Sequence, residues 1–184
     1  KHNCITPGLI DEMTEALQNL HNNKNVHTLV IRAEGKHFCA GADLTWMQET
    51  ATMSRDDNKK EARALADLLH LLYTLPQLTI GLLHGAVYGG GVGLAACMDL
   101  VLADVNTQFS FAEAKIGLIP STISPYVVKA IGSRHAKRFF MTAEVFGADI
   151  AEKIGLVSEI TEGDADARLN LILESVSKGG PEAR

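Results

Sequence analysis

Two short apolar runs of the chain are each followed by a segment of very small residues and then by a helical pattern. The runs cover residues 26–33 (VHTLVIRA) and 78–83 (LTIGLL), and the small-residue segments lie at 39–43 and 85–93. Short runs rich in β-branched residues are typical of buried strands in a parallel sheet. Because strands that alternate with helices build an α/β fold, whose ligands gather at loops after the strands, we expect the functional site at these two segments.

The rest of the chain continues the same alternation. We expect helices over residues 8–22, 44–48, 61–75, 91–98, 124–131, 133–141, 148–154 and 165–177, with further strands at 100–104 and near 156–160. The polar segment 50–60 is predicted to be a loop, and no repeat or linker divides the chain. The prediction is therefore one domain with parallel or mixed strands.

Composition and charge exclude several classes of protein. The 184 residues are 46% apolar and carry a net charge of −5, so the chain can bury a core and is a poor partner for nucleic acid. No run approaches the roughly 18 apolar residues that a membrane span needs. The three scattered cysteines indicate a reducing compartment, and we expect a cytoplasmic location. The seven histidines have no metal-ligand spacing, so no metal site is expected.

The small-residue segments can expose backbone N–H groups to a ligand. Amides at a helix N-terminus stabilise negative charge, and donors from two loops can converge on one oxygen that becomes anionic. Taken one at a time, the glycines can equally serve a sharp turn or close packing between helix and strand. Residues 91–96 also fit the dinucleotide pattern G-x-G-x-x-A, but Asp104 lies only 13 residues beyond Gly91, where about 20 are expected.

Read together, four segments resemble the enoyl-CoA hydratase/isomerase (crotonase) superfamily. They are HFCAGADL (37–44), HGAVYGGGVGLAACMDLVLAD (84–104), QFSFAEAKIGLIP (108–120) and AEKIGLVSEI (151–160). The resemblance covers essentially the whole chain. It implies an α/β fold of the crotonase-like ββα-superhelix type, with residues 1–184 as a single core domain that lacks the family's first strand and C-terminal helices. It also implies an acyl-CoA thioester as the bound molecule and a homotrimer or a dimer of trimers.

The resemblance assigns site residues by position. The backbone N–H groups of Ala42 and Gly90 would form an oxyanion hole for the thioester carbonyl, and Glu113 would be the catalytic acid and base. The loop backbone at Ala40 would receive the adenine of CoA. The remaining substrate-binding positions are Gly41, Asp43, Gly89, Gly91 and Trp46. No cofactor is implied beyond the CoA of the substrate, because backbone dipoles stabilise the enolate.

Some of these residues have a second interpretation. Asp43 can cap the helix that follows it, and Trp46 can simply pack in the core. The hydroxyls within residues 121–124 can contact the distal end of a substrate or cap the helix that starts near Ser124. A lone glutamate such as Glu113 is commonly a solvated helix-end residue, so its catalytic role depends on the resemblance.

The type of reaction depends on Gly93. Many hydratases of the family carry a further glutamate three residues after the oxyanion glycine, where this chain has Gly93. One carboxylate can serve syn hydration or double-bond isomerisation. Segments 40–48 and 116–132 resemble the 3-methylglutaconyl-CoA hydratases of leucine breakdown. The prediction is hydration of a branched α,β-unsaturated acyl-CoA. The alternatives are an enoyl-CoA double-bond isomerase and a catalytically silent CoA-ester binder.

Overall fold

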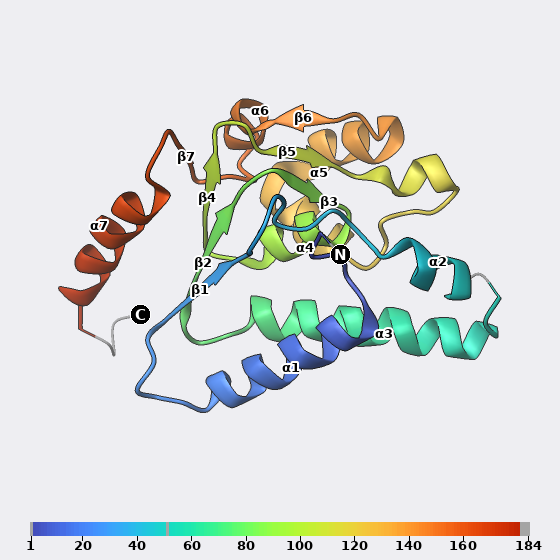
Figure 1. The fold of residues 1–184 in the computed structure, drawn as a ribbon, viewed down its shortest axis with the longest axis horizontal. Coiled ribbons are helices and arrows are strands. Elements are labelled where there is room, and N and C mark those ends of the chain that lie inside the picture. The colour runs from blue at the N-terminus through green and yellow to red at the C-terminus, as the bar shows by residue number, and fades with distance from the viewer. Residues whose placement is uncertain (1, 51, 181–184) are drawn as a thin grey trace.

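The computed structural model describes residues 2–50 and 52–180, which form two sheets and the helices around them (Figure 1). The first sheet is parallel throughout, with its strands in the order β1 (Thr28–Arg32), β2 (Leu78–Leu83), β4 (Leu100–Asp104) and β7 (Glu159–Thr161). The second sheet is smaller and contains β3 (Ala86–Tyr88), β5 (Gln108–Ser110) and β6 (Phe146–Gly147). Strands β3 and β5 are parallel, whereas β5 and β6 are antiparallel.

The chain contributes strands to the two sheets alternately. Strand β2 joins the first sheet, β3 joins the second, and helix α4 (Gly90–Cys97) follows; β4, β5 and helix α5 (Ser124–Thr142) repeat the sequence. The first turn is similar, because Cys39, after β1, forms an isolated parallel bridge to Val87 before helices α2 (Leu44–Thr50) and α3 (Arg55–Tyr73). The predicted ββα superhelix is therefore confirmed.

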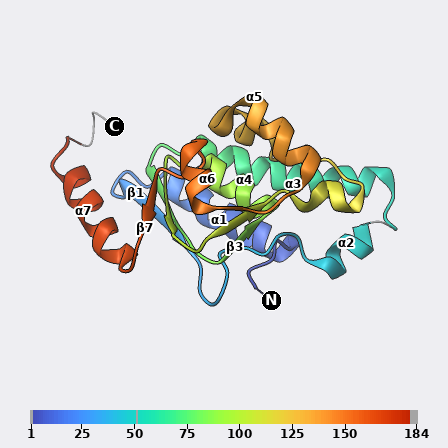
Figure 2. The same cartoon turned by 90° about the horizontal axis from the view of Figure 1, so that it is seen from above.

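Side chains on opposite faces of the first sheet enter different hydrophobic clusters. Val101 and Ala103 pack into the main core with helices α1 (Pro7–His21), α3, α4 and α5. Leu82 and Leu102 point the other way and pack against Leu169 of α7 (Ala165–Ser177). Figure 2 shows α7 apart from the other helices, at the edge of the molecule. The loops that follow the strands therefore lie beside the main core.

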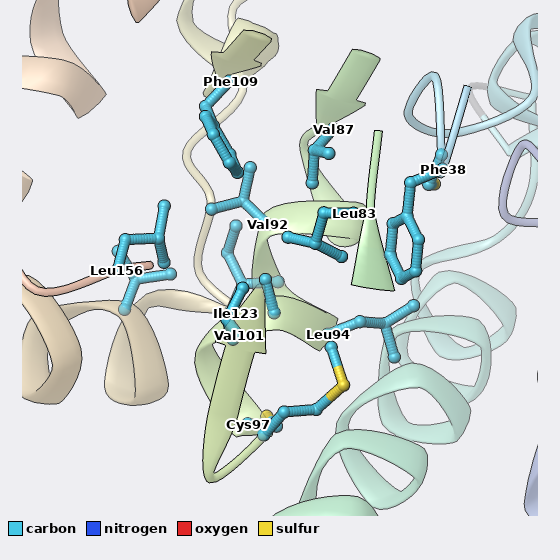
Figure 3. Close-up of a cluster of buried hydrophobic side chains, with 14 of the residues drawn as sticks. Phe38, Leu83, Val87, Val92, Leu94, Cys97, Val101, Phe109, Ile123 and Leu156 are labelled. Carbon is cyan, nitrogen blue, oxygen red and sulfur yellow. The ribbon is translucent and has the colours of Figure 1, made fainter. Parts of the chain in front are cut away.

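Helix α4 is enclosed on all sides. Its residues are small or apolar around the whole circumference, as expected for a helix with no solvent-facing stripe. Figure 3 shows Val92 and Leu94 of α4 among side chains from both sheets and from the start of α5. The surrounding side chains are Leu83, Val87, Val101, Phe109 and Ile123. This packing fixes α4 relative to both sheets.

Helix α3 begins earlier than predicted. The segment 50–60 was expected to be a loop, but α3 starts at Arg55. The Ser54 side chain accepts a hydrogen bond from the Asp57 N–H (3.2 Å), and Asp56 and Asp57 place negative charge in the first turn. The prediction was wrong because these turns are exposed and polar, so they carry no apolar period.

Other differences come from tertiary pairing. Strands β3, β5 and β6 are only two or three residues long and were not predicted. The last strand was expected near 156–160, but β7 begins at Glu159, and Leu156 is core. The two helices predicted at 124–131 and 133–141 are confirmed as the halves of α5, because Gly132 has non-helical dihedrals (φ 76°, ψ 155°).

Phe146 should be a major stabilising residue of the second sheet. Its ring stacks on those of Phe139 (centroids 4.1 Å apart) and Phe109 (5.6 Å). We expect Phe146→Ala to lower the free energy of unfolding by about 3–5 kcal/mol, because it leaves a cavity in the core. Urea unfolding followed by circular dichroism measures this. The adjacent Val145→Ala, at a side chain that is 49% exposed, should change it by less than about 0.5 kcal/mol; equal effects would contradict the prediction.

Candidate active site

Two loops and a short 3₁₀ helix meet where β3 ends. Gly89 follows β3 with a positive φ of 52°, and a Cβ placed on it would lie 3.2 Å from Glu113 Oε1 and 4.0 Å from Gly41 Cα. Gly41 also has a positive φ (105°), and its own Cβ would lie 3.7 Å from Tyr88 Cβ. The structure therefore brings together the two small-residue segments and the glutamate that the sequence singles out.

The first loop is held by backbone hydrogen bonds on both of its edges. On one edge, Cys39 N–H donates to Ala86 O (3.1 Å) and Tyr88 N–H donates to Cys39 O (2.9 Å). On the other, Ile5 N–H donates to Gly41 O (2.9 Å), and Asp43 N–H donates to Ile5 O (3.0 Å). Ala42 lies between these last two bonds, and its own N–H has no acceptor among residues 2–50 and 52–180.

The second loop contributes a backbone N–H donor, that of Gly90, at the start of α4. Gly89 is the N-cap residue: its N–H donates to Ser110 O (2.9 Å), and its carbonyl accepts from the N–H groups of Val92 and Gly93. Gly90 opens the helix and is half-buried, and within the described part of the chain its N–H donates to no protein group. Unpaired N–H groups at a helix N-terminus favour an anionic oxygen.

Glu113 supplies the only predicted acid or base at this point. It lies in the 3₁₀ helix η1 (Ala112–Ile116), where its carbonyl accepts from Leu118 N–H (3.0 Å). Its Oε2 is buried and has no hydrogen-bond partner among the described residues. Burial raises the pKa of the Glu113 carboxyl, and this effect outweighs an opposing backbone hydrogen bond. A carboxyl with a raised pKa and an Oε2 that has no partner in the described chain is suited to proton transfer.

Asp43 caps a helix and Trp46 packs against the core, as their second interpretation predicts. Asp43 Oδ1 accepts from the N–H groups of Thr45 (2.9 Å) and Trp46 (3.1 Å), so Asp43 caps α2. The Trp46 side chain packs against the main core, and its Nε1 is buried without a partner in the described chain. Their contacts with substrate stay a prediction, as does the contact of Ala40 with adenine.

The hydroxyls at the start of α5 do not cap that helix. Its N-cap residue is Ile123, which forms no side-chain cap, and Ser124 Oγ donates to Ser121 O instead (3.0 Å). The expected cap is therefore wrong. The reason is that the chain enters α5 through a turn in which Ser124 N–H already donates to Pro120 O (3.0 Å).

Gly91 and Gly93 lie inside α4 with their Cα atoms packed against other side chains. A Cβ on Gly91 would lie 2.7 Å from Cys39 Cβ, and one on Gly93 would overlap the side chain of Ile123. A dinucleotide fingerprint needs its glycines open to phosphate in the strand-to-helix turn. The dinucleotide alternative is therefore wrong. Ile123 also occupies the space that a side chain at position 93 would need.

Two residues contact the loops in a way that no sequence pattern predicts. His37 Nδ1 accepts from Ala86 N–H (3.0 Å), which ties the first loop to the start of β3. Burial lowers the pKa of His37, and the nearby charges of Lys36, His2 and His84 lower it further. Ile5 is the second such residue; it contacts both loops.

Two other kinds of site are absent from the described residues. Within residues 2–50 and 52–180, no cluster of three or more histidine, cysteine, aspartate or glutamate side chains has a metal-binding arrangement. In the same ranges, no helix combines the length and the apolar character needed to span a bilayer.

The superhelix and the meeting of both glycine loops with one carboxyl define a crotonase-type protein. Comparison with known families agrees: the family model described as "Enoyl-CoA hydratase/isomerase" matches residues 1–170. The chain belongs to the enoyl-CoA hydratase/isomerase family.

Individual relatives are similar over most of this chain. An enoyl-CoA hydratase from Shewanella pealeana has 38% identity and a TM-score of 0.97, covering 100% of this chain and 69% of that one. AtuE from Pseudomonas aeruginosa has 34% identity and a TM-score of 0.93, covering 98% and 70%. Human mitochondrial methylglutaconyl-CoA hydratase is 31% identical over an alignment of 185 positions, which covers 96% of this chain and 54% of the relative. The chain thus spans between half and three quarters of these proteins.

Glu113→Gln should stabilise the fold at neutral pH. The pKa of Glu113 is raised in the folded state, so ionisation opposes folding: the penalty is absent below the ordinary pKa of 4.5 and grows as the pH rises through the raised value. Glutamine avoids this penalty. We expect the variant's melting temperature to exceed that of the parent at pH 7–8, with the gain disappearing toward pH 4, as differential scanning calorimetry can show.

The exposed Glu162→Gln is the matched control and should show no such pH-dependent gain. A Glu113→Gln protein that is less stable than the parent at pH 7 would contradict the assignment of an unpaired Oε2 and a raised pKa to Glu113.

Proposed function

We propose that this chain is the core of a hydratase that adds water in syn geometry across the α,β-double bond of an acyl-CoA thioester. The observation that supports it is the meeting of both glycine loops with one carboxyl whose Oε2 has no partner among the described residues, with Glu113 Oε1 3.2 Å from the Cβ position of Gly89. Membership of the family supports the substrate class. No cofactor beyond the CoA of the substrate is needed in this proposal.

The oxyanion hole polarises the substrate. In the proposed complex, the thioester carbonyl accepts from the N–H groups of Ala42 and Gly90, both of which lack a protein acceptor in the described chain. This withdraws electrons from the conjugated double bond, so the β-carbon becomes electrophilic. The enolate oxygen that develops is stabilised by the same two donors, each worth about 3–4 kcal/mol of barrier.

Glu113 then moves one proton twice. Its carboxylate accepts a proton from water as the water oxygen bonds to the β-carbon and the π electrons move to the carbonyl oxygen. The protonated carboxyl next gives a proton to the α-carbon as the enolate collapses to the thioester. Water has then added across the double bond, and the glutamate is an anion again. The absence of any hydrogen-bond partner at Oε2 among the described residues leaves this oxygen available for both transfers.

An isomerase is the second candidate. The observation that favours it is the contact between Gly93 and Ile123, which leaves no room for a second carboxylate on that turn of α4. One carboxylate is enough to move a proton along an allyl system. Hydration is preferred because similar proteins in Shewanella and in human mitochondria are named as hydratases.

The branched, methylglutaconyl-type acyl group is the finer part of the proposal. It is supported by the 31% identity to human methylglutaconyl-CoA hydratase. In this proposal the substrate is bordered by Gly41, Asp43, Trp46, Gly89 and Gly91. Residue Ala40 lies next to the adenine. A cytoplasmic location and a role in leucine degradation stay predictions.

Glu113→Gln should abolish turnover while the thioester still binds. Loss of the acid and base should lower kcat by about 10²–10⁴, because general acid–base catalysis contributes that much. Turnover is followed by the absorbance of the conjugated thioester on 2-enoyl-CoA and 3-enoyl-CoA substrates, including 3-methylglutaconyl-CoA, and binding by calorimetry. Loss of the 2-enoyl band indicates a hydratase, whereas its appearance from 3-enoyl substrates indicates an isomerase.

The exposed Glu162→Gln should turn over like the parent. Near-normal activity of Glu113→Gln would contradict the proposed mechanism. Binding without turnover of any substrate by the parent chain would instead support a silent CoA-ester binder.

We also propose that the chain assembles as a homotrimer or a dimer of trimers. An apolar groove of about 380 Å³ lies between the segment after Glu113 and α5, lined in part by Leu118, Ile119 and Met141. Ile119 and Met141 are 78% and 76% exposed, and clustered apolar exposure is typical of an interface.

Ile119→Glu should therefore reduce the molar mass measured by sedimentation to that of a monomer. Val105→Glu, at an exposed valine (46%) that does not line this groove, should leave the molar mass unchanged; a monomeric parent protein would contradict the proposal.

A further inference from the structure

We infer that Ile5 is a positioning residue that sets the distance between the two amide donors of the oxyanion hole. The inference rests on the proposed function, because it gives Ile5 a role in the hole formed by Ala42 and Gly90. It concerns a residue far from Glu113 in sequence and outside every segment on which the family resemblance depends.

The backbone of Ile5 brackets Ala42. Ile5 N–H donates to Gly41 O, the carbonyl that precedes the Ala42 N–H in the same peptide bond (2.9 Å). Asp43 N–H donates to Ile5 O (3.0 Å), and the two bonds together form an isolated parallel bridge between Ile5 and Ala42. Because the Gly41–Ala42 peptide is planar, a bond to its oxygen fixes the direction of its N–H.

The side chain of Ile5 reaches the other donor. A Cβ placed on Gly90 would overlap Ile5 Cδ1 and would lie 3.6 Å from Cγ1. The terminal methyl therefore occupies the space directly beside the Gly90 Cα. Ile5 is 3% exposed and belongs to the main core, so this methyl has little freedom to move away. One buried residue thus contacts both donor peptides.

The remaining links between the loop and α4 do not replace this contact. Cys39 packs against Gly91, where a Cβ would lie 2.7 Å from Cys39 Cβ, but it fixes the loop at the end that precedes Gly41. At Ala42 itself, the described contacts come from Ile5. An oxyanion hole needs both donors about 2.7–3.1 Å from one oxygen, so a spacer between them controls its efficiency.

Ile5→Val tests this role because it removes only Cδ1. We expect kcat to fall about 10-fold with KM changed less than about 2-fold, since a misplacement of about 1 Å costs up to 10²-fold. A chromophoric donor-substituted cinnamoyl-CoA thioester reports the hole directly, because polarisation of its carbonyl shifts its absorbance to longer wavelength. This red shift should be smaller in Ile5→Val than in the parent.

Two further variants separate positioning from stability. Ile131→Val removes the same group from a side chain of equal exposure (3%) in the same core and should keep the parent kcat and red shift. Gly90→Ala should impair the parent, because its methyl overlaps Ile5 Cδ1. In the Ile5→Val background that methyl fills the vacated space, so the double variant should turn over faster than either single variant.

The outcomes distinguish this inference from the function on which it rests. A normal red shift in the parent that is unchanged in Ile5→Val, with unchanged kcat, overturns the role of Ile5 alone. Equal losses of kcat in Ile5→Val and Ile131→Val also overturn it, since they indicate a general effect of core packing. A parent protein that binds the thioester with no red shift overturns both the oxyanion hole and the role of Ile5.

Discussion

The site depends on the absence of a side chain at Gly89. The backbone there has a positive φ of 52°, which other L-residues seldom adopt, and the Cβ position is within 3.2 Å of the Glu113 carboxyl. Any larger residue would be strained by this φ and would press on Glu113 Oε1, while its Cβ would just touch the Gly41 Cα 4.0 Å away. One missing carbon atom therefore lets a loop, a helix N-terminus and an acid occupy the same small volume.

The superhelix explains how segments far apart in sequence reach this volume. Each turn adds one strand to each sheet, so the first loop and the start of α4 come from consecutive turns and lie side by side. Burial of α4 on all sides then holds Gly90 in place, while Glu113 arrives with the next turn, after β5. The geometry of the candidate site thus follows from the packing of the core.

Sequence patterns predicted the parts of the molecule whose signals are local. The apolar runs of β1, β2 and β4 and the two halves of α5 on either side of Gly132 could be read directly. The short strands could not, because two or three residues become a strand only through a partner elsewhere in the chain. Glu113 was identified by resemblance alone, and its unpaired Oε2 is a property of the fold. Ile5 looks like any apolar residue, since both of its contacts are distant in sequence.

The contact between Gly93 and Ile123 bears on the stereochemistry of the proposed reaction. Because Ile123 occupies the space beside Gly93, an acid or base on that turn of α4 has no room, and Glu113 must take the proton from water and return it. A single group that does both acts from one face of the substrate, so oxygen and proton add to the same face. Syn addition is then a consequence of the apolar packing around α4, and the raised pKa of Glu113 makes its carboxylate a stronger base toward the attacking water.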